Sequence, residues 1–466
     1  MRSLFNVMCI IKKIFVKFAD SNIWALILMP MFMAIAFFSC DTANDIKPLR
    51  EQVFIKLYGG LGTDEGNDLK VLPDGGFIMA GTTTSFGGTS DAYLIRADAM
   101  GNEIWTKNYD FGSDEIGTSV VIDEEGNFVV CGSIVDSISD GKPFRNVLVF
   151  KTDPSGNLQL SKTFGNPGDT LREEFANQII NIPGFGGYFI TASHIKNENQ
   201  SWFYLIRTDK DLNEIYLGVP ESNRRKYIGV SGALNIAATS VLVNAPNELF
   251  YTFGTTSGSG GGSSGTLPKG LNFYLTVWDA RVQNDYNPSF FGTDLDDLGI
   301  TFTMGTGAKN FLIGGYSGTA SGTEKKATLM KLLNAGTDVS PSFTTEWSWA
   351  DTIYATGNQV KSVVESAIQT VDGGIVALVT IENLSAQVND DFGLVKIGIG
   401  KGGQQQVLWN HVYGGNDFDK GGCLIELGDG SLAIVGSIGF PVNTPASVSK
   451  VGLLRLNANG ELIPNE

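Results

Sequence analysis

Residues 74–105 read DGGFIMAGTTTSFGGTSDAYLIRADAMGNEIW, and their pattern indicates the class of the fold. It holds two short apolar segments, FIMAG and AYLIRAD, each bounded by turn residues. The second segment runs into the tetrapeptide DAMG (98–101), where Gly can adopt the positive φ that a tight hairpin needs. Short apolar runs separated by such turns predict consecutive antiparallel strands.

The same unit recurs along the chain. Seven apolar segments of the FIMAG type, spaced 51 to 64 residues apart by subtraction of their positions, end at Gly81, Gly132, Ser193, Gly254, Gly315, Val379 and Gly436. Intervals of this length accommodate four short strands. The repeat therefore predicts an all-β, seven-bladed β-propeller over residues 53–466, with four antiparallel strands per blade and blades that cover one another's faces.

The two ends of this region are complementary. The last unit, GLLRLNANGELIPNE, leaves little room for an outer strand, whereas VFIKLYGG (53–60) is similar to the outer-strand segment VLWNHVYGG (407–415). We therefore expect residues 53–58 to complete the seventh blade. Such closure removes the free strand edges that would otherwise pair with another chain.

The N-terminus carries a targeting pattern. Basic residues precede an apolar run at 23–38, which is shorter than the roughly 20 residues that span a bilayer. The run ends in FFSC (37–40), which resembles a bacterial lipobox, although that family prefers Leu where Phe37 stands. The resemblance implies a lipoprotein signal peptide at 1–39, a lipidated Cys40 and a polar tether at 40–52, with an uncleaved N-terminal anchor as the alternative.

Both interpretations place the body of the protein outside the cytoplasm. We expect an outer-membrane lipoprotein of the cell envelope, held to the membrane through Cys40. Asp41 and Asp45 loosely resemble the surface-export signals of some outer-membrane lipoproteins.

The segments DGGFIMAG, DAYLIRADAMGNEIW and YGG resemble the propeller repeats of uncharacterised bacterial lipoproteins and, more distantly, of quinoprotein-like propellers. Quinone-dependent dehydrogenases stack their cofactor on a vicinal disulfide, but Cys131 and Cys423 are not adjacent and are expected to be unpaired core thiols. Sialidase-like propellers carry Ser-x-Asp-x-Gly-x-x-Trp boxes, and residues 98–105 have one residue too many between Asp and Gly. The resemblance thus implies a fold and no particular activity.

The composition of the chain excludes some classes of function. The 33 basic and 49 acidic residues give a net charge of -16, which excludes nucleic acid as a partner because binding a phosphate backbone requires clustered cations. His194 and His411 are the two histidines. The chain therefore has too few imidazoles for a metal site of three histidines and few candidates to activate a nucleophile. We expect no organic cofactor, and these features favour a binding protein over an enzyme.

Acidic residues recur between the outer strand of one unit and the first strand of the next, at Asp64, Asp114, Asp169, Asp294 and Asp417. Together with Phe86 and Trp202 in neighbouring loops, they could form a ligand-binding face at the mouth of the central channel. Part of a Ca²⁺ site could come from Asp294, Asp296, Asp417 and Asp419. The alternative is that each Asp caps its own turn, and recurrence in unit after unit favours that alternative.

Three functions remain open at this point. The favoured one is a non-catalytic binding or scaffold module for a glycan or a protein partner, as a monomer or within an envelope complex. A carboxylate-dependent glycan hydrolase or lyase would need a carboxyl pair about 5 to 10 Å apart with a raised pKa. A structural subunit of an envelope complex would need a large exposed apolar patch.

Overall fold

The computed structural model describes residues 53–139, 141–165, 173–182, 186–197, 200–215, 226–228, 237–244, 249–257, 270–279, 285–293, 295–306, 309–319, 325–337, 342–354, 360–383, 390–399, 405–415, 417–440 and 448–462. The expected signal peptide, Cys40 and the tether lie outside these residues, as do Asp169 and Asp294. Nowhere in the described chain is there a helix with the length and hydrophobicity to traverse a bilayer.

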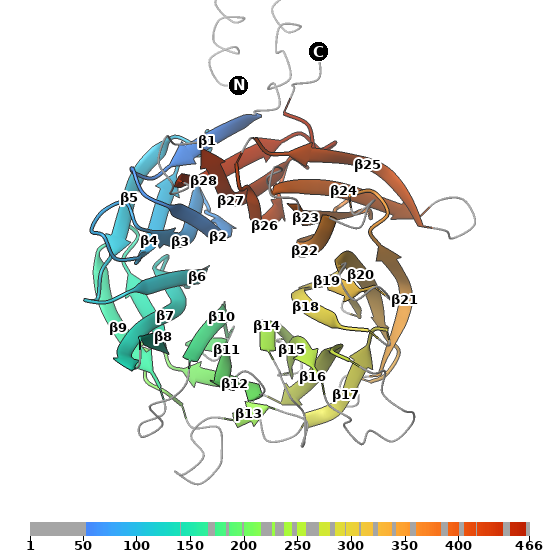
Figure 1. Cartoon of the computed structure of the whole chain (residues 1–466), viewed down its shortest axis with the longest axis horizontal. Coiled ribbons are helices and arrows are strands. Elements are labelled where there is room, and N and C mark those ends of the chain that lie inside the picture. Colours follow the sequence, from blue (N-terminus) through green and yellow to red (C-terminus); the bar gives the residue numbers. More distant parts are fainter. Residues whose placement is uncertain are drawn as a thin grey trace, which may run out of the picture. The chain divides into compact units, whose positions relative to one another are not determined.

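The described residues form seven four-stranded antiparallel sheets arranged as blades in a ring (Figure 1). Blades 1 to 3 comprise β2 (Asp64–Val71), β3 (Phe77–Thr83), β4 (Asp91–Ala97) and β5 (Glu103–Tyr109); β6 (Glu115–Ile122), β7 (Phe128–Ser139), β8 (Lys142–Thr152) and β9 (Leu158–Phe164); and β10 (Glu173–Asn181), β11 (Tyr188–Asn197), β12 (Gln200–Thr208) and β13 (Lys226–Ile228).

Blades 4 to 6 comprise β14 (Ala237–Asn244), β15 (Leu249–Thr256), β16 (Asn272–Asp279) and β17 (Asp285–Phe291); β18 (Asp297–Met304), β19 (Asn310–Gly318), β20 (Lys325–Asn334) and β21 (Phe343–Ala350); and β22 (Val360–Gln369), β23 (Ile375–Asn383), β24 (Asp391–Ile399) and β25 (Gln405–Tyr413). Blade 7 comprises β26 (Lys420–Glu426), β27 (Leu432–Phe440), β28 (Val448–Leu456) and β1 (Phe54–Tyr58). The expected seven-bladed β-propeller is confirmed.

The middle strands of the blades are buried on both faces. β3 and β15 are buried along their whole length, and one cluster joins Leu94 of blade 1 to Val120 and Phe128 of blade 2. A strand that is covered on both faces has no reason to alternate polar and apolar residues. This burial explains why the FIMAG-type segments are continuous apolar runs, whereas the outer strand β25 alternates half-buried and exposed positions.

Every inner strand, meaning the first strand of each blade, contains a one-residue bulge at the same place. The pairing register with the second strand skips one residue in each blade, namely Asn67, Thr118, Asn177, Thr239, Ile300, Glu365 and Gly422. A bulge leaves its extra residue unpaired and bends the strand. Six of these seven residues line one cavity in the central channel, so the bulge determines which side chains reach it.

The ring closes through the first strand of the described chain. β1 pairs antiparallel with β28, with Phe54 opposite Arg455 and Tyr58 opposite Val451. The N-terminal strand therefore provides the outer strand of blade 7, as the similarity between VFIKLYGG and VLWNHVYGG predicts.

Tyrosines at the ends of three outer strands fasten neighbouring blades together. The hydroxyl of Tyr58 donates to the carbonyl of Gly101 at 2.7 Å, and Tyr109 donates to Gly156 at 2.8 Å. Tyr413 makes the same hydrogen bond to Gly460. All three glycines have positive φ in the turn that follows the third strand of a blade. A Cβ on Gly101 would lie 2.5 Å from the Phe54 ring, so glycine is required both by the turn and by this contact.

Replacing Tyr58 by Phe tests this contact between blades. The substitution leaves the carbonyl of Gly101 without its buried donor, so we expect the free energy of unfolding to fall by about 1 kcal/mol. Phe164 stands at the corresponding end of the outer strand of blade 2, which indicates that an aromatic ring without a hydroxyl group fits at this position. Tyr109→Phe should show a similar loss in denaturant unfolding, and an unchanged midpoint in both variants would contradict a repeated interblade bond.

Candidate functional site

Five inner strands carry a buried acid at their first residue or one residue away from it, three residues before the bulge. These residues are Asp64, Glu115, Glu174, Asp297 and Asp419, and each is at most 1% exposed. Four of them accept backbone N–H groups from the preceding connection: Gly60 donates to Asp64 at 3.0 Å, Ser113 to Glu115 at 3.2 Å, Thr293 to Asp297 at 2.5 Å and Gly415 to Asp419 at 2.7 Å. These carboxylates hold the glycine-rich connection against the start of the inner strand.

Blade 6 meets the same requirement with different residues. Ser362 of β22 stands at the position of the acid, and its hydroxyl donates to Asp351 at 2.6 Å. Asp351 is fully buried and also accepts the N–H groups of Ile353 and Tyr354. A carboxylate from the preceding connection therefore replaces the one that the strand lacks, which indicates a structural need for an acid at this end of the channel.

The acids of the sequence analysis occupy different environments. Asp64 is buried and takes hydrogen bonds from Thr83, Ser85 and Gly60, so its oxygens are occupied by the protein. Asp114 and Asp417 are half-buried and accept the N–H groups of Ser90 and Phe418. Asp169 and Asp294 lie outside the described residues.

The expected aromatic residues lie apart from each other. Phe86 is 50% exposed in the connection between β3 and β4, with its ring centroid 5.8 Å from that of Tyr93. Trp202 is half-buried in β12, 5.6 Å from the ring of His194. The β3–β4 connection lies on the same face as the start of the inner strand, because Gly60 donates to the Ser85 hydroxyl at 3.1 Å.

The candidate calcium ligands are distributed between two blades. Asp296 is exposed and accepts the N–H of Leu271 at 3.0 Å, while Asp419 is buried. Within the described part of the chain, Asp296, Asp417 and Asp419 belong to no group of three ligand atoms close enough to share one ion.

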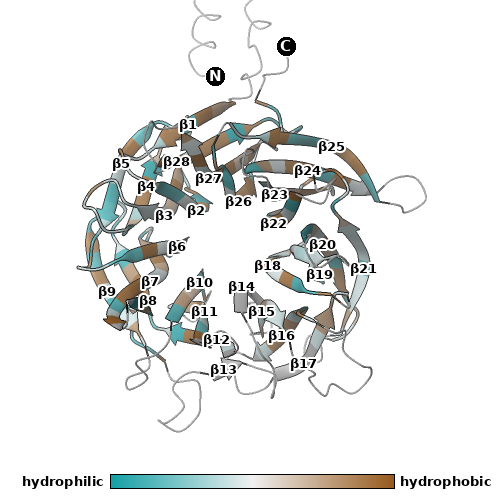
Figure 2. Cartoon of the chain, in the orientation of Figure 1, coloured by the Kyte–Doolittle hydropathy of each residue, from teal (hydrophilic) through white to brown (hydrophobic). Residues whose placement is uncertain are grey.

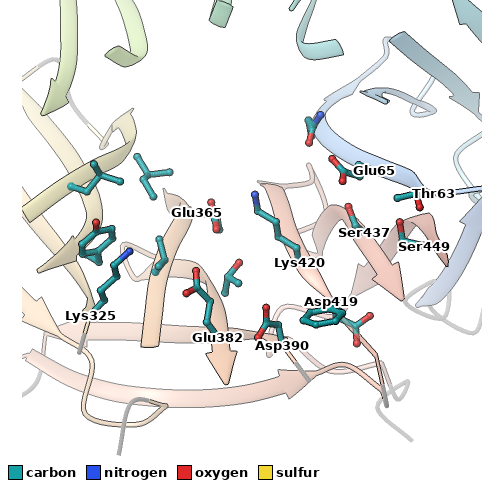
Figure 3. Close-up of a pocket in the computed structure, with 17 residues that line it drawn as sticks. Thr63, Glu65, Lys325, Glu365, Glu382, Asp390, Asp419, Lys420, Ser437 and Ser449 are labelled. Carbon is teal, nitrogen blue, oxygen red and sulfur yellow. The ribbon is translucent and has the colours of Figure 1, made fainter. Parts of the chain in front are cut away.

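A cavity of about 590 Å³ occupies one end of the central channel (Figure 3). Blade 6 contributes Glu365 and Glu382 to its wall, and blade 7 contributes Lys420. On the blade 5 side, Lys325 lies with its Nζ 4.4 Å from the ring centroid of Tyr316. The remaining polar lining includes Glu65, Thr63, Asp390, Ser437 and Ser449. Both signs of charge and several hydroxyl groups thus face one space.

Phe418 adds an exposed aromatic surface to this cavity. Its side chain is 59% exposed, and it follows directly on Asp417 in the connection that leads to the inner strand β26. An aromatic ring in such a place offers an apolar face next to polar groups.

Burial governs the protonation of the acids here. It raises the pKa of Glu365, an effect that Lys420 partly offsets and Glu382 reinforces. Burial also raises the pKa of Asp419, although the N–H groups of Gly439 and Gly415 act in the opposite direction. These carboxyl groups hold protons more tightly than exposed ones and so offer donors as well as acceptors over part of the acidic pH range.

A second cavity of about 530 Å³ continues among the bulged residues of the inner strands. It shares Glu65, Asn67, Glu365 and Lys420 with the first cavity. Cys423 also lines it; both Cys423 and the buried Cys131 are unpaired thiols, as expected from their sequence environment.

Sequence reasoning missed Glu365, Glu382, Lys420 and Phe418 as cavity residues. An alignment of the seven inner strands on their bulges carries the signal, because Glu365 is a bulged residue and Lys420 stands two residues before a bulge. The charged residues at these two positions mark where the repeat faces the channel.

No known family model matches this sequence, and no curated protein sequence matches it. Among solved structures, the chain is similar to Sqt1 from Chaetomium thermophilum, with 10% identity over 86% of this chain and 100% of that chain and a TM-score of 0.44. It is also similar to the Hadza microbial sialidase Hz136 (8% identity, 79% and 73% coverage, TM-score 0.40) and to the WD40 domain of SCAP from fission yeast (8%, 89% and 100%, 0.40). At these identities the likeness concerns the fold alone.

The structural role of the buried acids can be tested with two isosteric variants two residues apart. Asp419→Asn turns an amide N–H₂ toward donors that need an acceptor, so we expect the free energy of unfolding to fall by about 1–3 kcal/mol. Asp417→Asn, at a half-buried position, should change it by less than about 0.5 kcal/mol. Equal effects of the two variants in denaturant unfolding would contradict a specific role for Asp419.

Proposed function

We propose that this chain is a membrane-anchored extracytoplasmic β-propeller that binds a glycan, without catalysis, at the mouth of its central channel. The observation that carries the proposal is the cavity of about 590 Å³ with its mixed lining of carboxylates, amines and hydroxyls. Its volume lies within the range of about 300–1,000 Å³ typical of small-ligand pockets.

The lining suits a polyhydroxylated ligand. Sugar hydroxyls both donate and accept hydrogen bonds, so they can bind Glu365 and Glu382 as well as Lys325 and Lys420. The exposed ring of Phe418 can stack on the apolar face of a sugar. A protein partner remains the alternative occupant, because a channel mouth with several charged residues also accommodates a polar side chain.

The imidazoles do not supply catalytic groups to this cavity. His194 pairs with Glu174 at 3.1 Å inside blade 3, and His411 bonds the carbonyl of Asn459 at 2.9 Å between blades 6 and 7. Neither histidine lines the cavity. A hydrolase or lyase at this site would have to rely on carboxyl groups.

One observation supports that second candidate function. Glu365 combines a raised pKa with the nearby carboxylate of Glu382, the combination that an acid and base pair needs. A carboxylate-dependent glycan hydrolase or lyase would use Glu365 as the proton donor. The binding experiment below separates the two functions by looking for product.

The structural-subunit alternative has weaker support. The most exposed apolar side chains include Leu61, Ile138 and Val371, which belong to segments of different blades. Figure 2 shows hydrophobic and hydrophilic residues interleaved around the ring. A binding module with a polar cavity fits this distribution better than a subunit held by one large apolar face.

Glycan binding by the purified full-length protein tests the proposal. On a glycan panel we expect binding without released product, and Phe418→Ala should weaken it by about tenfold or more through the lost stacking surface. Glu382→Gln should weaken it by about ten- to a hundredfold, because it removes a charged hydrogen-bond acceptor. Phe86→Ala, an exposed aromatic outside the cavity, is the matched control and should bind normally.

If the unmodified protein releases product and Glu365→Gln does not, the result contradicts the binding module and supports a carboxylate-dependent enzyme. Failure to bind any glycan would contradict the proposed ligand and favour a protein partner. Loss of binding in the Phe86→Ala control alone would place the ligand outside the channel mouth.

The membrane anchor makes an independent prediction. Acylation requires the thiol of Cys40, so Cys40→Ala should abolish labelling by a radioactive or clickable fatty acid and leave the signal peptide uncleaved. Immunoblots of labelled cells and of membrane fractions measure both effects. Normal labelling of Cys40→Ala would show that another residue is modified, and absence of label from the unmodified chain would favour the uncleaved anchor.

A further inference from the structure

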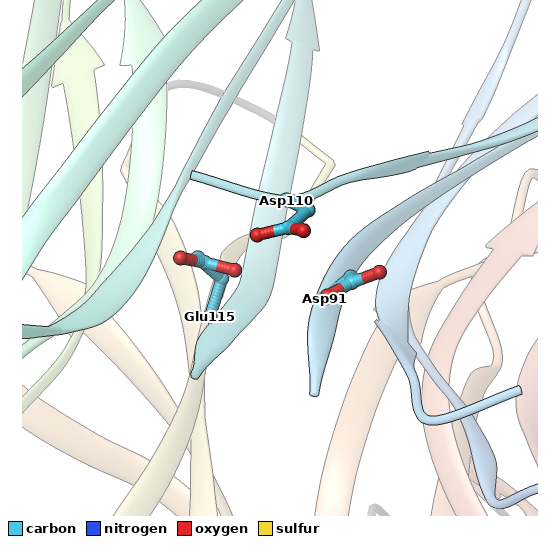
Figure 4. A group of neighbouring side chains, drawn as sticks. All are labelled: Asp91, Asp110 and Glu115. Carbon is cyan, nitrogen blue, oxygen red and sulfur yellow. The ribbon is translucent and has the colours of Figure 1, made fainter. Parts of the chain in front are cut away.

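Three carboxylates converge at the junction between blades 1 and 2 (Figure 4). Asp91 begins β4, Asp110 directly follows β5, and Glu115 begins β6. One oxygen of each lies within 4.8 Å of the other two. None of the three lines the channel cavities, so this cluster is separate from the proposed glycan site.

Glu115 has an oxygen that no protein group satisfies. The side chain is fully buried; Oε1 accepts the N–H of Ser113 at 3.2 Å, whereas Oε2 has no hydrogen-bond partner. Among the described acids that begin inner strands, Asp64 and Asp419 have donors on both oxygens. A buried carboxylate oxygen without a donor is costly unless a cation binds it or a proton neutralises it.

Asp110 departs from the repeat at this place. The residue after the aromatic end of the outer strand is Gly in four other units, namely Gly59, Gly165, Gly292 and Gly414. A Cβ on Gly59 would lie 1.9 Å from Asp64 Oδ2, and one on Gly292 would lie 2.2 Å from Asp297 Oδ2. Asp110 therefore adds a carboxylate where those four units have only a glycine beside the inner strand.

The junction between blades 6 and 7 provides an internal comparison. It holds the corresponding buried acid, Asp419, close to Asp391 at the start of β24, but Gly414 stands where Asp110 stands in the first junction. Both oxygens of Asp419 are satisfied by backbone N–H groups. The third carboxylate and the unsatisfied oxygen thus occur together at the junction of blades 1 and 2.

We propose that Asp91, Asp110 and Glu115 bind a Ca²⁺ ion that ties blade 1 to blade 2. Ca²⁺ binds carboxylate oxygens at about 2.3–2.6 Å, so two oxygens on one ion are at most about 4.6–5.2 Å apart. The three oxygens of this cluster lie within 4.8 Å of one another and are compatible with that limit. Mg²⁺ requires near-octahedral geometry, keeps several of its waters and is usually held by one or two carboxylates, so a site of three carboxylates suits it less well.

The surroundings are consistent with a bound cation. In the described chain, none of the three carboxylates takes part in an ion pair with a basic side chain. Asn108 donates to Asp91 at 2.6 Å and Gly112 donates to Asp110 at 2.7 Å, which leaves free lone pairs on both residues. Asp110 is exposed, so water can reach the ion and complete its six to eight oxygen ligands.

Burial and two neighbouring carboxylates make the ionised form of Glu115 unfavourable. Its burial, together with Asp110 and Asp91, raises its pKa to about 7. A cation would remove this unfavourable charge accumulation and hold Glu115 ionised.

Thermal unfolding of the full-length protein in CaCl₂ and in EDTA tests the site. We expect Ca²⁺ at about a hundredfold above its Kd to raise Tm by about 3 °C, with binding heat in calorimetric titration. Asp110→Gly gives this junction the residue found in four other units, and Asp110→Asn keeps the size of the side chain. Both variants should fold in EDTA, lose the Ca²⁺-dependent rise in Tm and weaken binding at least tenfold.

Asp136→Asn removes an exposed acid of β7 outside the cluster and is the matched control, which should keep the full rise in Tm. The proposal is overturned if the unmodified protein shows neither binding heat nor a rise in Tm with Ca²⁺. It is equally overturned if the rise persists in Asp110→Gly and Asp110→Asn, because the ion would then bind elsewhere. An equal effect of Mg²⁺ at the same concentration would contradict the assignment of Ca²⁺.

Discussion

The one-residue bulge in each inner strand is the constraint on which the interior of this propeller depends. Successive side chains of a regular strand point to opposite faces of its sheet. The bulge interrupts this alternation, and consecutive residues around it, such as Asn67 and Asp68 or Glu365 and Ser366, line the same cavity. The channel consequently carries a dense polar lining, although the blades themselves are packed through continuous apolar strands.

The chemistry of the molecule is concentrated where individual units depart from the repeat. A residue type that recurs in most units has a structural explanation, as the buried acids at the start of five inner strands illustrate. Glu365 and Lys420 vary at positions that face the channel, and Asp110 replaces a glycine at a position that faces the neighbouring blade. Within a repeat protein, comparison with the other units shows which residues depart from the shared pattern and therefore need a functional explanation.

Much of the fold could be predicted from the sequence, because it follows from local patterns. The FIMAG-type runs, the DAMG-type turns and the orphan segment 53–60 specify strands, hairpins and closure through residues near one another in the chain. The site could be predicted only in part. Recurrence indicated that the acids between units cap their turns, and Asp64 and Asp419 do so. The positions of Glu365 and Lys420 depend on a bulge, and the meeting of Asp91 with Glu115 depends on how two blades pack, which no local pattern encodes.

Closure by β1 also has a mechanical consequence. Elsewhere in the ring, successive blades are linked by the covalent chain, but blade 7 is completed through the ladder of five residue pairs between β1 and β28. A force applied to the chain that enters at Phe54 is therefore borne by this ladder and by the Tyr58 hydrogen bond to blade 1 before it reaches the rest of the core. The seam between β1 and β28, together with the packing of Tyr58 and Phe54 in an apolar cluster of blades 7 and 1, resists the opening of the ring.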